Sequence, residues 1–134
     1  MVVDDDPAMR LVVRVVLERE GHDVLEAAHG KAALDLLQRD SLPDVVMTDL
    51  IMPVLDGLEL IDRLRSEAPT AAIPIIVLSG SVDDLQKLAD SGLVEAVVPK
   101  PYDPARLAQC VRLVAAKGRG SEATGSGPDK ASAA

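Results

Sequence analysis

Aromatic residues are almost absent from this 134-residue chain, which contains Tyr102 but no Phe or Trp. Hydrophobic residues make up 48% of the sequence, so a buried core is possible, but it must consist mainly of aliphatic side chains. The length suits one domain of ordinary size. We therefore expect a single folded unit in which branched aliphatic residues supply the packing.

Cysteine and positive charge are also scarce. Cys110 is the one cysteine, which excludes an internal disulfide and favours a reducing compartment. Lys and Arg number 14 against 22 Asp and Glu, and the net charge of −8 argues against direct binding of nucleic acid. No apolar run approaches the roughly 18 residues that a membrane helix needs, and the sequence begins without a signal-peptide pattern. We expect a cytoplasmic protein without membrane insertion.

Short apolar runs alternate with stretches of helical periodicity. The runs predict strands at 2–3, 23–27, 45–50, 75–78 and 96–98. Helix-starting pairs such as Asp6–Pro7 and Asp103–Pro104 follow some of them, and glycines follow the periodic stretches. Val12, Leu58 and Ala89 are among the positions whose spacing predicts an inward-facing side chain. Such alternation implies an α/β fold, with five parallel strands and five helices in three layers.

The composition changes at residue 118. Gly, Ser, Ala and Thr dominate from there, and no hydrophobic period is present. This predicts a folded domain over residues 1–117, followed by a disordered tail or linker over residues 118–134.

Four of the five predicted strands end in a chemically capable group. These groups are Asp4–Asp5, Asp49, Ser79 and Lys100. If the sheet has the doubly wound order 2-1-3-4-5, the strands that carry them are neighbours, and the groups line one crevice. Three clustered carboxylates repel one another unless a cation is present, and oxygen ligands suit a hard ion such as Mg²⁺.

That arrangement predicts phosphoryl transfer to a carboxylate. The metal would keep Asp49 ionised and therefore nucleophilic, and the product would be an aspartyl phosphate. Lys100 could place its charge on the phosphoryl oxygens, and the Ser79 hydroxyl could donate a further hydrogen bond. Phosphoryl transfer depends mostly on such positioning and charge stabilisation.

Each residue also has a simpler interpretation. The acidic run 4–6 alone is typical of a helix cap with solvated neighbours, and Ser79 and Lys100 alone are ordinary strand-end residues. His22 and His29 lie beside glycines, where we expect exposed loop positions without a role. Cys110 falls on an apolar helical stripe and is predicted to be a core residue. The site hypothesis depends on the conjunction of the four groups at successive strand ends.

With these residues identified, the chain resembles a bacterial response-regulator receiver domain over residues 1 to about 117. The resemblance is carried by Val2-Val3-Asp4-Asp5, Asp49, Met52-Pro53, Asp56-Gly57, Ser79-Gly80 and Lys100-Pro101. It implies that Asp49 accepts a phosphoryl group from a histidine kinase or a histidine phosphotransfer protein. It also implies that Asp4, Asp5, Asp49 and the Ile51 backbone carbonyl hold Mg²⁺, that Ser79 and Lys100 hold the phosphoryl group, and that the Lys100–Pro101 bond is cis.

The same resemblance implies a switch and not an enzyme. Phosphorylation would change the surface of the fourth helix, fifth strand and fifth helix, and a downstream protein would read that surface. Val97 stands where the family often has Tyr or Phe, so we expect the change to proceed through shifts around 79–81. The first strand is short, and no output domain follows in this sequence. A stand-alone regulator and a piece of a larger protein are therefore both open.

Three other readings compete. Asp4-x-Asp6 imitates the acidic pair of haloacid-dehalogenase phosphatases, which would place phosphate on Asp4. A flavodoxin-like nucleotide binder would need a phosphate loop where this chain has three acids that repel anions. A pseudo-receiver would keep the fold as an interaction module without phosphorylation. The affinity for Mg²⁺ and the position of the phosphate discriminate among them.

Overall fold

The computed structural model describes residues 1–39 and 42–126, with side chains described as far as residue 117. Five parallel strands form one sheet in the order β2-β1-β3-β4-β5, which confirms the predicted topology. The strands are β1 (Val2–Val3), β2 (Glu26–Ala27), β3 (Val46–Asp49), β4 (Ile75–Ser79) and β5 (Ala96–Pro99). The α-helices are α1 (Pro7–Arg19), α2 (Gly30–Arg39), α3 (Gly57–Ser66), α4 (Val82–Ser91) and α5 (Pro104–Ser126), with a 3₁₀ turn at Thr70–Ala72.

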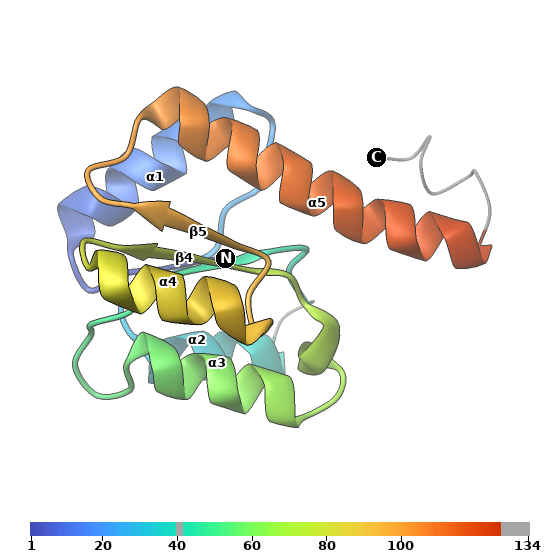
Figure 1. Ribbon diagram of the computed structural model, residues 1–134, viewed down its shortest axis with the longest axis horizontal. Coiled ribbons are helices and arrows are strands. Elements are labelled where there is room, and N and C mark those ends of the chain that lie inside the picture. The colour runs from blue at the N-terminus through green and yellow to red at the C-terminus, as the bar shows by residue number, and fades with distance from the viewer. Residues whose placement is uncertain (40–41, 127–134) are drawn as a thin grey trace.

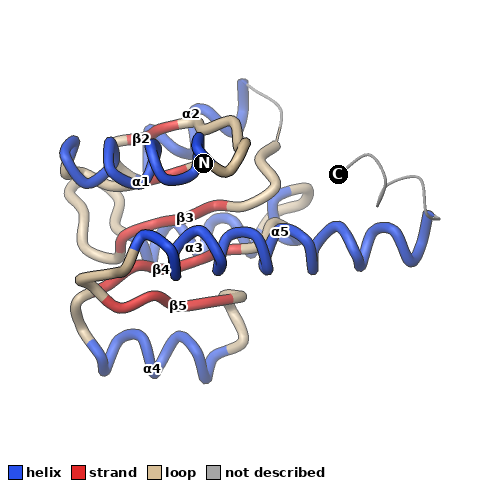
Figure 2. Tube along the Cα trace, turned by 90° about the horizontal axis from the view of Figure 1, so that it is seen from above, coloured by secondary structure: helices blue, strands red, loops and turns tan. Residues whose placement is uncertain are grey.

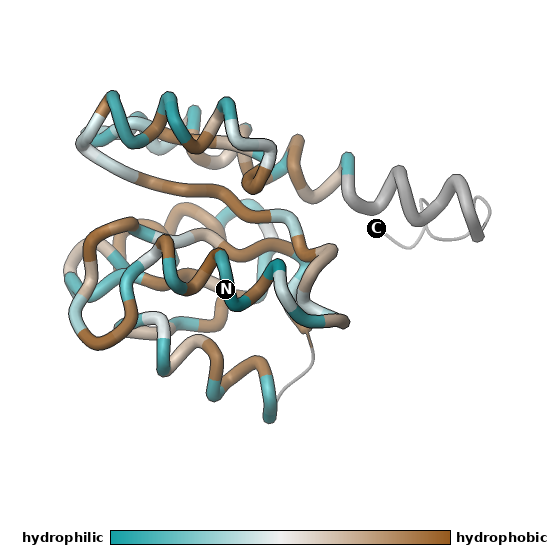
Figure 3. The backbone as a smooth tube through the Cα atoms, turned by 60° about the horizontal axis from the view of Figure 1, so that its bottom comes forward, coloured by the Kyte–Doolittle hydropathy of each residue, from teal (hydrophilic) through white to brown (hydrophobic). Residues whose placement is uncertain are grey.

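The sheet is covered on both sides (Figure 1). Helices α1 and α5 lie on one face, and α2, α3 and α4 lie on the other, with α4 beside the β5 edge in Figure 2. Successive side chains of a strand point to opposite faces, so each strand serves two cores. Met47 and Ile76 pack with α1 and α5, whereas Val46 and Ile75 pack with the other three helices. The strands are accordingly drawn largely in brown in Figure 3, while the helices alternate.

Side-chain caps place the helix starts at the carboxyl edge of the sheet. The Asp6 carboxylate accepts hydrogen bonds from the amides of Ala8 and Met9, with Pro7 as the first helical residue of α1. Asp56 caps α3, Ser81 caps α4, and Asp103 accepts from the Ala105 amide at the start of α5. These caps confirm the predicted helix starts, because capping depends on residues within one turn.

Burial within the helices differs from several predictions. Val12 and Leu58 are 42% and 52% exposed, and Ala89 is also exposed, whereas Leu60 is completely buried in α3 together with Leu64. His22 and His29 are both half-buried, so the prediction that they are exposed was wrong, and the Nδ1 of His29 accepts from the Ala32 amide at the start of α2. The apolar period alone left the rotation of each helix open, and the sheet decided which side faces inward.

Several element boundaries also differ, and the largest differences concern β2 and α5. Strand β2 covers Glu26–Ala27 and not 23–27, because its one partner, β1, is two residues long. Helix α5 continues to Ser126, into the segment predicted as a tail. Residues 127–134 of that segment lie outside the described residues, so the domain boundary stays a prediction. Among the described helices, none is long and apolar enough to span a bilayer.

Candidate functional site

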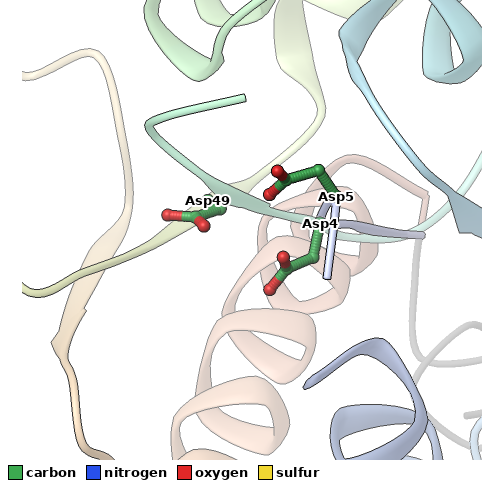
Figure 4. Close-up of side chains that lie close together, drawn as sticks. All are labelled: Asp4, Asp5 and Asp49. Carbon is green, nitrogen blue, oxygen red and sulfur yellow. The ribbon is translucent and has the colours of Figure 1, made fainter. Parts of the chain in front are cut away.

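The groups predicted from the strand ends meet at the carboxyl edge of the sheet. Asp4 and Asp5 follow β1, Asp49 and Ser79 end β3 and β4, and Lys100 follows β5. Carboxylate oxygens of Asp4, Asp5 and Asp49 lie within 4.8 Å of one another. Figure 4 shows the three side chains close together. Neighbouring parallel strands place their ends side by side, which is why residues as distant as 4 and 49 share one site.

Lys100 faces the acidic cluster. Its Nζ donates to Asp49 Oδ2 at 3.0 Å and lies 4.0 Å from Asp4 Oδ2. The Lys100 backbone amide donates to the Ser79 carbonyl at 2.9 Å, which fixes the lysine beside the end of β4. The Lys100–Pro101 bond is cis, as expected from the resemblance. One flexible cation therefore sits against the carboxylate predicted to react.

The three carboxylates differ in exposure. Asp4 is 2% exposed, Asp5 is exposed, and the Asp49 side chain is 15% exposed. Burial raises the pKa of Asp4, and the charges of Asp49 and Asp5 act in the same direction, against the Asp6 amide and Lys100. Asp4 is thus a buried acid that ionises reluctantly, whereas Asp49 can be reached from solvent.

Asp4→Asn should stabilise the metal-free protein at neutral pH. A carboxyl with a raised pKa in the folded state binds more protons when folded, so its ionisation lowers the free energy of unfolding as pH rises through that pKa. Asparagine keeps the oxygen that accepts from the Asp6 amide and removes the charge. Urea unfolding with a chelator, from pH 4 to pH 8, should show a gain that shrinks on acidification. A loss of stability at pH 7, or an equal gain in the exposed control Asp62→Asn, would contradict this account.

Two glycines, Gly30 and Gly57, pack closely against the loop that follows Asp49 and donate hydrogen bonds to it. The Gly57 amide donates to the Leu50 carbonyl at 2.7 Å, and a Cβ on Gly57 would lie 2.3 Å from the Asp49 carbonyl oxygen. A Cβ on Gly30 would lie 2.6 Å from the Leu55 carbonyl oxygen, which accepts from the Gly30 amide. Helices α2 and α3 can therefore approach the loop closely because these positions lack side chains. Ile51 within this loop has a 78% exposed side chain, and the role of its carbonyl stays a prediction.

Val54 stores backbone strain in the same loop. Its φ is +71°, a left-handed conformation that β-branched residues rarely adopt, and its side chain is 70% exposed. Val54→Asn should stabilise the protein by about 1 kcal/mol, because asparagine tolerates this conformation and little burial is lost. Urea unfolding measures the change. Val82, which is 73% exposed and not in this conformation, provides the control Val82→Asn; equal effects at both positions would show that strain is not the cause.

Ser79 links the site to α4. Ser79 is 4% exposed, and its Oγ accepts from the Ser81 amide at 3.1 Å. The Ser81 Oγ accepts in turn from the Asp84 amide at 3.2 Å and so caps α4. Any movement of the Ser79 hydroxyl toward the crevice must therefore disturb the start of this helix.

The sequence reasoning missed Tyr102 at this site. The Tyr102 hydroxyl is buried and has no hydrogen-bond partner among the described residues. Burial raises its pKa, and the nearby charges of Asp4 and Asp6 raise it further, so the hydroxyl is neutral at pH 7. Its place two residues after Lys100 was the available signal. As the one aromatic residue of the chain, Tyr102 gives a fluorescence probe whose hydroxyl responds to the charges of Asp4 and Asp6.

The comparisons with known proteins agree with this geometry. The family described as "response regulator receiver domain" matches residues 1–112. The chain belongs to this family. A chemotaxis protein CheY homologue from Campylobacter jejuni is 36% identical over 126 residues, which cover 92% of this chain and 96% of the relative. An uncharacterised 14.6 kDa protein from Leptolyngbya boryana is 40% identical over 116 residues, 85% of each chain.

Solved structures show the same likeness for this receiver domain. The crystal structure of a putative response regulator from Chloroflexus aurantiacus superposes with a TM-score of 0.79 at 30% identity, covering 86% of this chain and 94% of that one.

The geometry of the site argues against the phosphatase interpretation. Asp4, its required nucleophile, is buried, and Asp6, its required acid, is engaged as the cap of α1.

Proposed function

We propose that this receiver domain is a phosphoacceptor whose Asp49 takes a phosphoryl group from the phosphohistidine of a histidine kinase or phosphotransfer protein. The observation that carries the proposal is the contact of Lys100 Nζ with Asp49 Oδ2 at 3.0 Å, inside a cluster of three carboxylates at the sheet edge. A cation beside a reachable carboxylate is the arrangement that a transferred phosphoryl group requires.

The transfer consists of one displacement at phosphorus. An Asp49 carboxylate oxygen forms the new P–O bond while the P–N bond of phosphohistidine breaks, and its electron pair goes to the imidazole nitrogen, which then takes a proton from solvent. With acetyl phosphate as donor, a P–O bond breaks and acetate leaves. Lys100 and the Ser79 hydroxyl would hold the equatorial oxygens. The chain is modified by the reaction, so it acts as a phosphoacceptor and not as an enzyme that turns over a separate substrate.

The donor set fits a hard divalent cation. Asp4, Asp5 and Asp49 offer carboxylate oxygens close together, and the Ile51 carbonyl would add a neutral oxygen. Burial is the main cause of the raised pKa of Asp4, and the charges of Asp49 and Asp5 add to it, so ionisation of this carboxyl is costly without a cation. Mg²⁺, when bound, would neutralise charge on both the carboxylates and the incoming phosphoryl group.

Phosphotransfer from acetyl phosphate with and without Mg²⁺, followed by mass-spectrometric mapping, tests the proposal. We expect one phosphoryl group on Asp49 that depends on Mg²⁺. Phosphate on Asp4 would favour phosphatase-like chemistry. An absence of both labelling and Mg²⁺ binding would favour the pseudo-receiver.

The proposed output surface comprises α4, β5 and α5, which a downstream protein would read. The conformational change would spread from the crevice to this surface, beginning with Ser79, which is linked through Ser81 to the start of α4. The conformational change is a population shift between two conformations of the domain. The extent of this shift is limited by the difference in affinity of the phosphoryl group for the two conformations. Val97 on β5 is half-buried, pairs with Val77 and packs against the core, and it lacks the rotamer freedom for a large swing.

Val97→Ala should therefore keep most of the phosphorylation-dependent change. Truncation removes some packing, and we expect a loss of stability on the order of 1 kcal/mol. Backbone amide NMR of Mg²⁺- and beryllofluoride-treated protein against untreated protein should still show large shifts near Ser79 and in α4. If those shifts vanish in the variant while the wild type shows them, Val97 carries the switch and the proposed path is wrong.

A further inference from the structure

Arg10 of α1 reaches the backbone of the acidic cluster. Its Nη1 donates to the Asp4 carbonyl oxygen at 2.8 Å, and its Nε donates to Glu26 Oε1 at 3.2 Å on β2. The Arg10 and Glu26 side chains are 19% and 27% exposed, so water competes only partly for these contacts. The guanidinium thus ties the end of β1 to the edge strand, using the fixed fork of its donors.

The Asp4 carbonyl belongs to the peptide unit that leads into Asp5. The Asp4 amide already donates to the Ala27 carbonyl at 3.1 Å, and the Asp4 carboxylate accepts from the Asp6 amide at 2.9 Å. Arg10 supplies the remaining hydrogen bond, which goes to the Asp4 carbonyl oxygen that precedes Asp5. Because a peptide unit is planar, fixing this carbonyl also fixes the direction in which the chain leaves toward Asp5.

We infer that Arg10 is a positioning residue for the divalent-cation site, holding the Asp4–Asp5 peptide so that the two carboxylates face Asp49. This inference rests on the proposed function. Residues that orient ligands without touching the metal typically contribute 10–100-fold to metal affinity. Loss of the Arg10 contacts should therefore weaken Mg²⁺ binding.

Simple electrostatics predicts the opposite sign. Arg10 is a cation near an acidic cluster, so removing it would leave more negative charge and tighten Mg²⁺ binding if the residue acted through charge alone. The sign of the change therefore separates positioning from charge.

Arg14 provides a matched control on the same helix. Its Nη1 donates to Glu26 Oε2 at 2.8 Å, but its other side-chain hydrogen bond goes to Glu18 and not to Asp4. Arg10→Met and Arg14→Met each remove one positive charge from α1 and one contact with Glu26. They differ in that Arg10→Met also removes the hydrogen bond to the Asp4 carbonyl, whereas Arg14→Met leaves it in place.

Isothermal titration calorimetry with Mg²⁺ tests the inference. We expect Arg10→Met to bind Mg²⁺ about 10–100-fold more weakly than wild type, and Arg14→Met to stay within about threefold. In acetyl phosphate reactions, Arg10→Met should need more Mg²⁺ for half-maximal labelling yet approach the wild-type rate at saturating Mg²⁺. Unchanged or tighter binding in Arg10→Met, or equal weakening in both variants, would overturn the inference.

Two further outcomes are distinguishable. If Arg10→Met does not fold, Mg²⁺ binding is measured on Arg10→Lys. Lysine keeps the positive charge but lacks the planar guanidinium that donates to Asp4 and Glu26 together. Weaker Mg²⁺ binding in Arg10→Lys supports the inference, and wild-type affinity overturns it. If wild-type protein itself binds no Mg²⁺, the proposed function fails first; if wild type and Arg10→Met bind equally, the positioning role alone fails.

Discussion

Asp49→Asn is expected to reduce phosphoryl incorporation from acetyl phosphate to the level of a reaction without protein. The amide keeps the size of the side chain and can still accept from the Leu50 amide, as Asp49 Oδ1 does at 2.8 Å. It cannot act as an anionic nucleophile, and no other carboxylate of the cluster combines exposure with contact to Lys100 at hydrogen-bond distance. Labelling followed by intact-mass measurement reads out the result.

The control for Asp49→Asn is Asp62→Asn. Asp62 is exposed on α3 and lies outside the acidic cluster, so its variant should be labelled like wild type. Labelling of Asp49→Asn at the wild-type rate would assign the phosphate to another residue, and peptide mapping would then show whether Asp4 or Asp5 takes it.

Lys100→Ala is expected to separate transfer from metal binding. Removing one charged donor from a transition-state oxygen typically costs about 10²–10³ in rate, and we expect phosphorylation to slow by that order. Mg²⁺ affinity should be unchanged or higher, because Lys100 Nζ lies 3.0 Å from Asp49 and 4.0 Å from Asp4 and competes with a cation for their charge. Labelling rates and Mg²⁺ calorimetry on the same samples measure the two effects.

Asp5→Ala gives the contrasting case. It removes a carboxylate from the cluster, so Mg²⁺ affinity and phosphorylation should fall together. The control for Lys100→Ala is Lys87→Ala, which removes one positive charge from an exposed position of α4. If Lys100→Ala weakened Mg²⁺ binding as strongly as Asp5→Ala, the division of roles between lysine and carboxylates would be wrong.

The sequence by itself determined the features that depend on neighbouring residues. Caps such as Asp6 and Ser81 act within one turn, and apolar runs such as 75–78 form buried strands because their side chains fill both faces of a sheet. The alternation of these elements leaves few topologies, which is why the strand order 2-1-3-4-5 and the convergence of Asp4, Asp49 and Lys100 could be predicted.

The tertiary structure decided what depends on contacts between distant residues. Leu60 faces the core where Leu58 was expected, because the sheet sets the rotation of α3 and the periodicity does not. Asp4 is buried and Asp5 is exposed, and the contacts that fix Asp4 come from distant elements: its carbonyl accepts from Arg10 of α1, and its amide donates to Ala27 of β2. A run of three acids carries no local signal for such differences, since charge and burial are properties of the assembled site and not of the residue type.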